Sequence, residues 1–225
     1  MKKTVNLVIV LLVIACICAC VSGITRVIES QTSDDPSVYL VLVNKKHPLP
    51  DDWESKVQID RVQNSLGEEL QIEHRTYENF LKLREALLRE GVQVELDSVY
   101  RSVAEQQAIW DEWSADPELG EEYCQQYLAV PGFSEHHTGL AVDIFIMKNG
   151  EEIRDNDDMI ADVEDFAKVH ALLAEYGFIL RYPQGKDDIT GYAYEPWHLR
   201  YIDDTRIARE IQQNGLTLEE YLEKR

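Results

Sequence analysis

Two segments of the sequence carry residue types that a buried core would not contain without a chemical reason. Residues 134–143 read SEHHTGLAVD and include His136 and, seven residues later, Asp143, which interrupts an otherwise apolar run. A carboxylate that faces a core is costly unless it is paired or coordinated to a metal. Glu195 and His198 lie close together in a second segment that reads YEPWH. These residues are therefore candidates for one metal site.

Their side chains match the composition of a catalytic zinc site. Two imidazoles and one carboxylate fill three positions of a tetrahedral ion and leave the fourth open for water. Zinc lowers the pKa of that water from about 15.7 to about 7. Glu195, separated from His198 by a rigid proline, is suited to act as the general base and later protonate a leaving amine. Arg101, in the segment DSVYRS, is expected to hold a substrate carboxylate, which an exopeptidase must recognise at a chain end.

The other histidines and the remaining cysteine have a structural interpretation. His47, His74 and His170 lack neighbours suited to metal binding, and we expect them to be structural. His137 follows a candidate ligand directly, but neighbours in an extended segment point to opposite sides, so it should not share the metal. Cys124 is the one cysteine outside the N-terminal apolar run, so the domain should contain no disulfide framework.

Hydrophobic spacing and turn residues predict the elements that position these side chains. The predicted strands are 38–43, 92–96 and 141–147, the last followed by an Asn149-Gly150 turn. The predicted helices are 76–90 with Thr76 as its cap, one from the capping box Ser102–Glu105 through Trp113, 158–176 ending at Gly177, and two short helices opened by Asp204 and Thr217. Helices and strands do not alternate regularly, which favours an α+β fold.

The two segments resemble the signatures of a known enzyme family. SEHHTGLAVD fits the S-x-H-x-x-G-x-A-x-D signature of the VanY-type and VanX-type zinc D-Ala-D-Ala peptidases, and EPWH fits their E-x-W-H signature. The similarity to the VanY-like carboxypeptidase branch extends from VLVNKKHPLP to ITGYAYEPWHLRYI. The resemblance implies an α+β fold in which a small antiparallel sheet is flanked by helices.

Residue by residue, the resemblance implies specific roles. It implies that zinc (Zn2+) is bound by His136, Asp143 and His198, with Glu195 as the general base. It also implies that Arg101 and Gln106, from YRSVAEQ, contact the terminal carboxylate region of the peptide, and that Ser134 and Tyr182 line the same cleft. The sequence departs from the family at Val99, where glycine is usual. Because valine tolerates few positive-φ conformations, we expect the loop that presents Arg101 to differ slightly.

Composition narrows the possible partners. The 225 residues suffice for one sizeable domain plus a targeting segment, and 44% of them are hydrophobic, as in proteins with a packed core. The net charge of −20 argues against nucleic acid, because phosphate binding depends on Lys and Arg.

The N-terminus is predicted to export the rest of the chain. Lys2 and Lys3 precede an almost entirely apolar run from Val5 to Ile24, about long enough to span a bilayer. Residues 1–24 are thus either an uncleaved membrane anchor or a lipoprotein-type signal, since VIAC and ICAC both resemble a lipobox. Residues 25–37 are expected to be a polar tether, and residues 38–225 the zinc carboxypeptidase domain.

The combined expectation is an extracytoplasmic, membrane-anchored zinc metallo-carboxypeptidase, acting as a monomer. It would hydrolyse the C-terminal D-Ala of peptidoglycan stem peptides or of their lipid-linked precursor, as a D,D-carboxypeptidase. An L,D-carboxypeptidase acting on tetrapeptide stems and a D,D-dipeptidase stay open, because the sequence does not show pocket shape. Two further alternatives are a non-hydrolytic cell-wall-binding module, which should have lost the base or a ligand, and a structural zinc site, which needs a fourth protein ligand.

Overall fold

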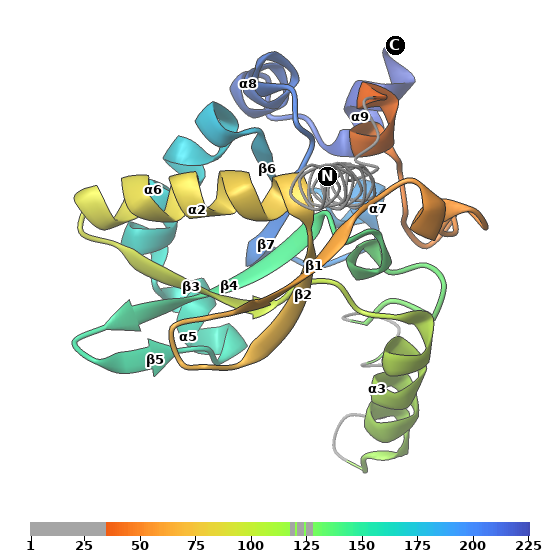
Figure 1. The fold of residues 1–225 in the computed structure, drawn as a ribbon, viewed down its shortest axis with the longest axis horizontal. Coiled ribbons are helices and arrows are strands. Elements are labelled where there is room, and N and C mark those ends of the chain that lie inside the picture. Colours follow the sequence, from red (N-terminus) through yellow and green to blue (C-terminus); the bar gives the residue numbers. More distant parts are fainter. Residues whose placement is uncertain (1–34, 118–119, 121–123, 125–127) are drawn as a thin grey trace, which may run out of the picture. The chain divides into compact units, whose positions relative to one another are not determined.

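The structure is a computed structural model that describes residues 35–117, 120, 124 and 128–225 (Figure 1). The predicted targeting segment, 1–24, lies outside these residues, as do all but the last three positions of the predicted tether, 25–37. In the part of the chain that is described, no helix is both long enough and apolar enough to cross a membrane.

Two antiparallel sheets are found among the described residues. The larger consists of β3 (Gln93–Ser98), β4 (Ala141–Lys148), β5 (Glu151–Ile153), β6 (Phe178–Tyr182) and β7 (Glu195–Tyr201). Its order is β3-β4-β7-β6, and β5 pairs with β4. The β4–β5 hairpin turns at Asn149 and Gly150, which both have positive φ, as a tight hairpin turn requires. The smaller sheet pairs β1 (Ile59–Gln63) with β2 (Glu69–Glu73).

Helices connect and cover these strands (Figure 1). The α-helices are α2 (His74–Arg89), α3 (Val103–Ala115), α5 (Asn156–Ala161), α6 (Val163–Leu172), α7 (Asp187–Thr190), α8 (Thr205–Gln213) and α9 (Leu218–Glu223). The 3₁₀ helices are η1 (Pro36–Leu40), η2 (Trp53–Ser55), η3 (Glu135–Thr138) and η4 (Leu173–Tyr176).

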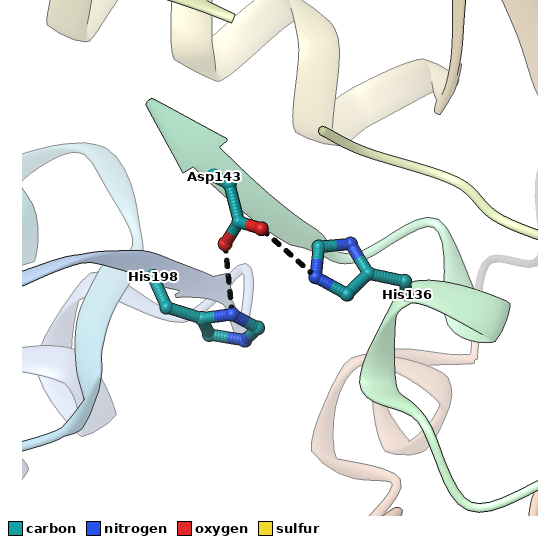
Figure 2. A group of neighbouring side chains, drawn as sticks. All are labelled: His136, Asp143 and His198. Atoms are coloured by element: carbon teal, nitrogen blue, oxygen red, sulfur yellow. Dashed lines mark ion pairs between the residues drawn. The ribbon is translucent and has the colours of Figure 1, made fainter. Parts of the chain in front are cut away.

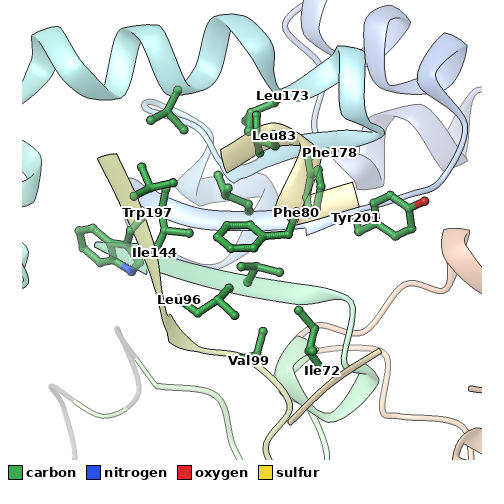
Figure 3. Close-up of a cluster of buried hydrophobic side chains, with 14 of the residues drawn as sticks. Ile72, Phe80, Leu83, Leu96, Val99, Ile144, Leu173, Phe178, Trp197 and Tyr201 are labelled. Carbon is green, nitrogen blue, oxygen red and sulfur yellow. The ribbon is translucent and has the colours of Figure 1, made fainter. Parts of the chain in front are cut away.

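The main core lies between the larger sheet and helices α2 and α6. Phe80 and Leu83 of α2 pack with Ile144 of β4 and Trp197 of β7 in one buried cluster (Figure 3). Burying side chains of this size stabilises the fold by about 1.5–3 kcal/mol each. Successive strand residues point to opposite faces of a sheet. The side chains that alternate with these core residues therefore point to the other face of the sheet, where they can form a site.

Most of the predicted elements are confirmed, including the α+β class. Strands 92–96 and 141–147 correspond to β3 and β4, and helix 76–90 corresponds to α2. The capping box that opens α3 is present, with reciprocal bonds between Ser102 and Glu105. Asp204 and Thr217 are the N-caps of α8 and α9, as predicted.

Three local predictions are wrong. Residues 38–43 do not form a strand, because Asp35 accepts a hydrogen bond from the Ser37 amide and Pro36 occupies the first turn of η1. The helix predicted for 158–176 ends at Gly177 but is split into α5, α6 and η4, since the backbone leaves helical geometry at Asp162. The cap of α2 is Glu73, whose carboxylate accepts the backbone N–H of Thr76; Thr76 itself lies inside the helix.

Gly139, between η3 and β4, should be intolerant of a side chain. Its φ is +72°, and a Cβ there would lie 2.7 Å from Cδ1 of Ile59 and 3.1 Å from the backbone nitrogen of Glu73. We expect Gly139→Ala to destabilise the protein by roughly 2–4 kcal/mol, because backbone strain and overpacking add. Gly150→Ala is the control: φ is +83° but no atom lies within 4 Å, so only about 1 kcal/mol should be lost. Equal denaturant midpoints for the two variants would contradict the steric argument.

Candidate metal centre and active site

The pairing of β4 with β7 places two candidate ligands side by side. In this antiparallel register, Asp143 lies directly opposite His198. Val142 and Ile144, which flank Asp143, both belong to the hydrophobic core, so the aspartate lies on the other face of the sheet. On β7 the core residues Trp197 and Leu199 flank His198 in the same way. The register between β7 and β6 shifts in this part of the strand, between Leu199 and Glu195.

The third candidate ligand comes from the segment just before β4. His136 lies in η3, which Ser134 caps by accepting a hydrogen bond from the His136 amide at 3.3 Å. Gly139 then takes a left-handed conformation, which ends η3 and turns the chain into β4. The chain reversal brings the imidazole of His136 back toward Asp143 (Figure 2).

The three side chains converge on one point. Nε2 of His136 lies 3.1 Å from Oδ2 of Asp143, and Nδ1 of His198 lies 2.8 Å from Oδ1 of the same carboxylate (Figure 2). One ligand atom from each residue can be chosen so that all three lie within 4.8 Å of one another. Ligands on a tetrahedral zinc ion are separated by about 3.3 Å, given metal–ligand distances near 2.0–2.2 Å.

The surroundings of the three residues fit a metal ion. Oδ1 of Asp143 is buried and has no hydrogen-bond partner among the described residues, despite its short contact with His198. Nδ1 of His136 faces the carbonyl oxygen of Val99 at 2.6 Å, which favours a proton on Nδ1 and leaves Nε2 as a free electron-pair donor. Two neutral imidazoles and one carboxylate suit zinc, and a cation would satisfy the orphaned oxygen.

Glu195 lies beside this cluster because β7 is irregular. Residues three apart on a regular strand point to opposite faces, yet Oε2 of Glu195 lies 3.6 Å from Nδ1 of His198. The β6–β7 register shifts between Leu180 and Tyr182, so Tyr182 pairs with Glu195. Such irregularities re-aim side chains next to active sites. Burial raises the pKa of Glu195 to about 8, although the neighbouring His198 opposes this shift.

Arg101 reaches the same cavity with its guanidinium held from two sides. Its Nη1 donates to Oε1 of Gln106 at 2.8 Å, and its Nη2 donates to Oγ of Ser98 at 2.9 Å. Gln106 in turn donates to the carbonyl of Ala129 at 2.7 Å and is fully buried. Gln106 therefore positions the arginine, and its predicted contact with substrate stays a prediction. Val99 does not take positive φ, so the valine causes no backbone strain in this loop.

The predicted site residues line one cavity of about 220 Å³. All three candidate ligands, Glu195, Arg101 and Gln106 line it, together with Ser134 and Tyr182. The Tyr182 ring lies 4.7 Å from the His198 ring, centroid to centroid. Ser134 and Tyr182 are therefore placed where the resemblance implied, and their contact with substrate stays a prediction.

The histidines interpreted as structural make contacts within the protein. His137 faces the carbonyl of Arg101 at 2.6 Å through Nδ1 and accepts the Gly132 amide at 3.0 Å through Nε2, so both ring nitrogens are engaged away from the ligand cluster. Nδ1 of His74 lies 2.6 Å from Asp60, and Nε2 of His170 lies 2.9 Å from the carbonyl of Pro196. The latter contact braces the β7 segment next to Glu195.

Comparisons with known proteins agree with this site. The sequence profile of the VanY family, described as D-alanyl-D-alanine carboxypeptidase, matches residues 69–204. YodJ of Bacillus subtilis is 40% identical over 210 residues, which cover 90% of this chain and 74% of that protein. This chain belongs to the VanY family.

Solved structures of VanY-like enzymes share the fold. A VanY D,D-pentapeptidase mutant in complex with Zn(II) is 33% identical, with a TM-score of 0.66 covering 82% of this chain and 99% of that one. The LD-carboxypeptidase LdcB is 39% identical, with a TM-score of 0.71 covering 86% and 89% of the two chains. The predicted family and fold are thereby confirmed, and the His/Asp/His cluster of this VanY family member is consistent with a zinc-like metal.

Sequence analysis missed one residue of this site. Glu135, next to His136, is buried and pairs with Arg181 and Arg200, each at 2.7 Å. Burial opposes its ionisation, but the two guanidinium groups hold its pKa well below the usual range. The signal in the sequence was an acidic residue, Glu135, directly before the candidate ligand His136. Its arginine partners lie on β6 and β7, two strands that the sequence pattern did not predict.

Metal binding to this VanY site should release a proton. In the metal-free protein, burial opposes a charge on His198, but Asp143 outweighs it and raises the pKa to about 10. A metal must displace that proton, whereas His136 has a lowered pKa, caused mainly by burial, and is already neutral. We expect roughly one proton released per zinc ion near pH 7, with affinity rising about tenfold per pH unit. Calorimetry in buffers of different ionisation enthalpy measures this number, and a binding enthalpy independent of the buffer would contradict it.

Proposed function

We propose that this chain is a zinc-dependent D,D-carboxypeptidase that removes the C-terminal D-alanine from peptidoglycan stem peptides. The observation that carries this proposal is the convergence of three candidate ligands, a partly buried glutamate and an arginine held by two hydrogen bonds on one cavity. Zinc would be held by Nε2 of His136, a carboxylate oxygen of Asp143 and Nδ1 of His198. When bound, it would polarise the scissile carbonyl and acidify the attacking water.

Glu195 is the proposed general base. Its carboxylate lies beside His198 without being a member of the ligand cluster, so it is free to accept the proton of the attacking water. The same group then delivers that proton to the amine of the departing D-alanine. Its raised pKa suits both transfers, because an acid–base group works best when its pKa lies near the operating pH.

Arg101 is the proposed recognition element for the chain end. Its guanidinium is planar and held by Ser98 and Gln106, so little conformational entropy is lost when a carboxylate binds to it. A charge-assisted pair between Arg101 and the terminal carboxylate would align the last peptide bond with the metal and Glu195. Ser134 and Tyr182 would contact the peptide from the walls of the same cavity.

L,D-carboxypeptidase activity is a second candidate, favoured by the similarity to LdcB. LdcB is an LD-carboxypeptidase, and the identity and TM-score to it are both higher than those to the VanY pentapeptidase. The volume of the cavity, about 220 Å³, does not separate the two activities.

The composition of the cluster weighs against non-enzymatic alternatives. A binding module that had lost hydrolysis would be expected to lack a ligand or the base, and all of them are in place. A structural zinc site needs a fourth protein ligand, and among the described residues the cluster consists of His136, Asp143 and His198 alone. For such a wall-directed enzyme we further propose an extracytoplasmic location, supported by the apolar N-terminal run in the sequence.

Glutamine at position 195 should abolish proton transfer while the metal stays bound. We expect turnover of Glu195→Gln to fall about 10²- to 10⁴-fold, because an amide cannot accept the proton from water. Zinc content should match that of the wild type. Glu175→Gln, the same change on an exposed residue, serves as the control and should leave turnover unchanged. Near-normal turnover in a zinc-loaded Glu195→Gln enzyme would remove the assigned base.

The site of cleavage can be read directly from the products. Purified muropeptides with pentapeptide and tetrapeptide stems, incubated with the zinc-loaded enzyme, should show loss of one alanine from the pentapeptide by mass spectrometry. Selective loss from the tetrapeptide would instead establish the L,D-activity, and release of alanine from free D-Ala-D-Ala would indicate a dipeptidase. An enzyme that changes none of these substrates would refute the proposed function.

A further inference from the structure

Four buried charged side chains lie next to the candidate metal ligands. Glu135 and Glu219 supply two negative charges, and Arg181 and Arg200 supply two positive ones. The side chains of Glu135, Arg181 and Arg200 are fully buried, and that of Glu219 is 9% exposed. Because burying an unpaired charge is costly, such a set persists only when its members neutralise one another.

The two oxygens of Glu135 have different surroundings. Oε1 accepts hydrogen bonds from Nε of Arg181 and Nη1 of Arg200, both at 2.7 Å. Oε2 faces Nε2 of His198 at 3.6 Å. Among the described residues neither Oε2 of Glu135 nor Nε2 of His198 has a hydrogen-bond partner, although both are buried. These two atoms are therefore each other's available partners.

We propose that Glu135 is a positioning residue that selects the tautomer of His198. A carboxylate oxygen only accepts, so it favours the form of the ring with a proton on Nε2. That form leaves Nδ1, the nitrogen that faces Asp143, as the electron-pair donor for a metal. The inference rests on the metal site of the proposed function, but not on the identity of the substrate.

Glu219, on helix α9, supplies the second counter-charge of this set. Glu219 forms two hydrogen bonds with Arg181, at 2.6 and 2.9 Å, and also accepts from Asn44 at 3.0 Å. Arg181 is thereby paired with two carboxylates, and of these two it is Glu135 that also faces His198.

A purely structural role for Glu135, as a counter-charge for the arginines, is the alternative. The two roles differ in Glu135→Gln. The arginines require an acceptor, so the amide oxygen should turn toward them and the amide NH₂ toward His198. An NH₂ group donates to Nε2, which favours the proton on Nδ1 and blocks the metal position. Glu219→Gln changes the same cluster in the same way but does not touch His198, and is the matched control.

The test compares metal affinity and stability in both variants. Zinc affinity is measured by chelator competition, the geometry by the absorption spectrum of the cobalt-substituted protein, and stability of the metal-free protein by denaturant unfolding. We expect Glu135→Gln to bind zinc about 10- to 100-fold more weakly with an altered cobalt spectrum. Glu219→Gln should lose comparable stability yet keep the wild-type affinity and spectrum.

Several outcomes would overturn the assignment. Wild-type zinc affinity in Glu135→Gln would do so, as would affinity losses in both variants that simply follow their losses of stability. If Glu135→Gln does not fold, Glu135→Asp keeps the charge but withdraws the oxygen from His198, and unchanged zinc affinity there would equally refute the proposal. A wild-type protein inactive on all muropeptides would end the proposed function without affecting this metal-binding result.

Discussion

The antiparallel pairing of β4 with β7 is the constraint on which the site depends. It fixes Asp143 opposite His198, with core residues on either side holding both strands in register. A one-residue slip would turn every side chain of the strand to the other face, so the hydrophobic core and the metal cluster specify the same register. Two of the three candidate ligands, Asp143 and His198, therefore lie on the opposite face of the strands that build the core, and η3 supplies the third.

Two partly buried carboxylates near the metal position, Asp143 and Glu195, have opposite tendencies to ionise. Burial alone would raise the pKa of both. For Asp143 the two adjacent imidazoles overcome burial and hold its pKa far below the usual range. Glu195 is farther from His198 and lacks a direct hydrogen-bonding cation, so burial wins and its pKa rises to about 8. The aspartate is thereby suited to bind a cation and the glutamate to exchange a proton, and their surroundings separate the two roles.

Much of the candidate site was predictable from sequence because its candidate ligands and base lie in two short segments. His136 and Asp143 lie on one continuous stretch, and the turn between them requires only Gly139. The strand that carries His198 was not predicted, because Pro196 lies within it and its alternation is broken by the irregularity that re-aims Glu195. That irregularity depends on pairing with β6, which no local pattern encodes.

Ion pairs between residues far apart in the sequence were a second feature that could not be predicted from it. Glu135 of η3 meets Arg181 of β6 and Arg200 of β7, and Arg181 meets Glu219 of α9, only after these elements have assembled. No spacing rule connects these positions, whereas the capping box that opens α3 connects residues three apart and was recognisable. The ligands could thus be found from the sequence, while the groups that orient them required the fold.

The catalytic set that we propose also limits where substrate choice can be encoded. VanY and LdcB, whose names give them different cleavage sites, are both similar to this chain over more than four-fifths of its length. In the proposed mechanism, three ligands, a base and an arginine would act on the peptide bond and the chain end, which are common to both substrates. Discrimination must therefore come from walls that meet the residue before the scissile bond, where stereochemistry differs. Trp113, Asn156, Met159 and Tyr192 are among the residues that line the cavity outside this catalytic set.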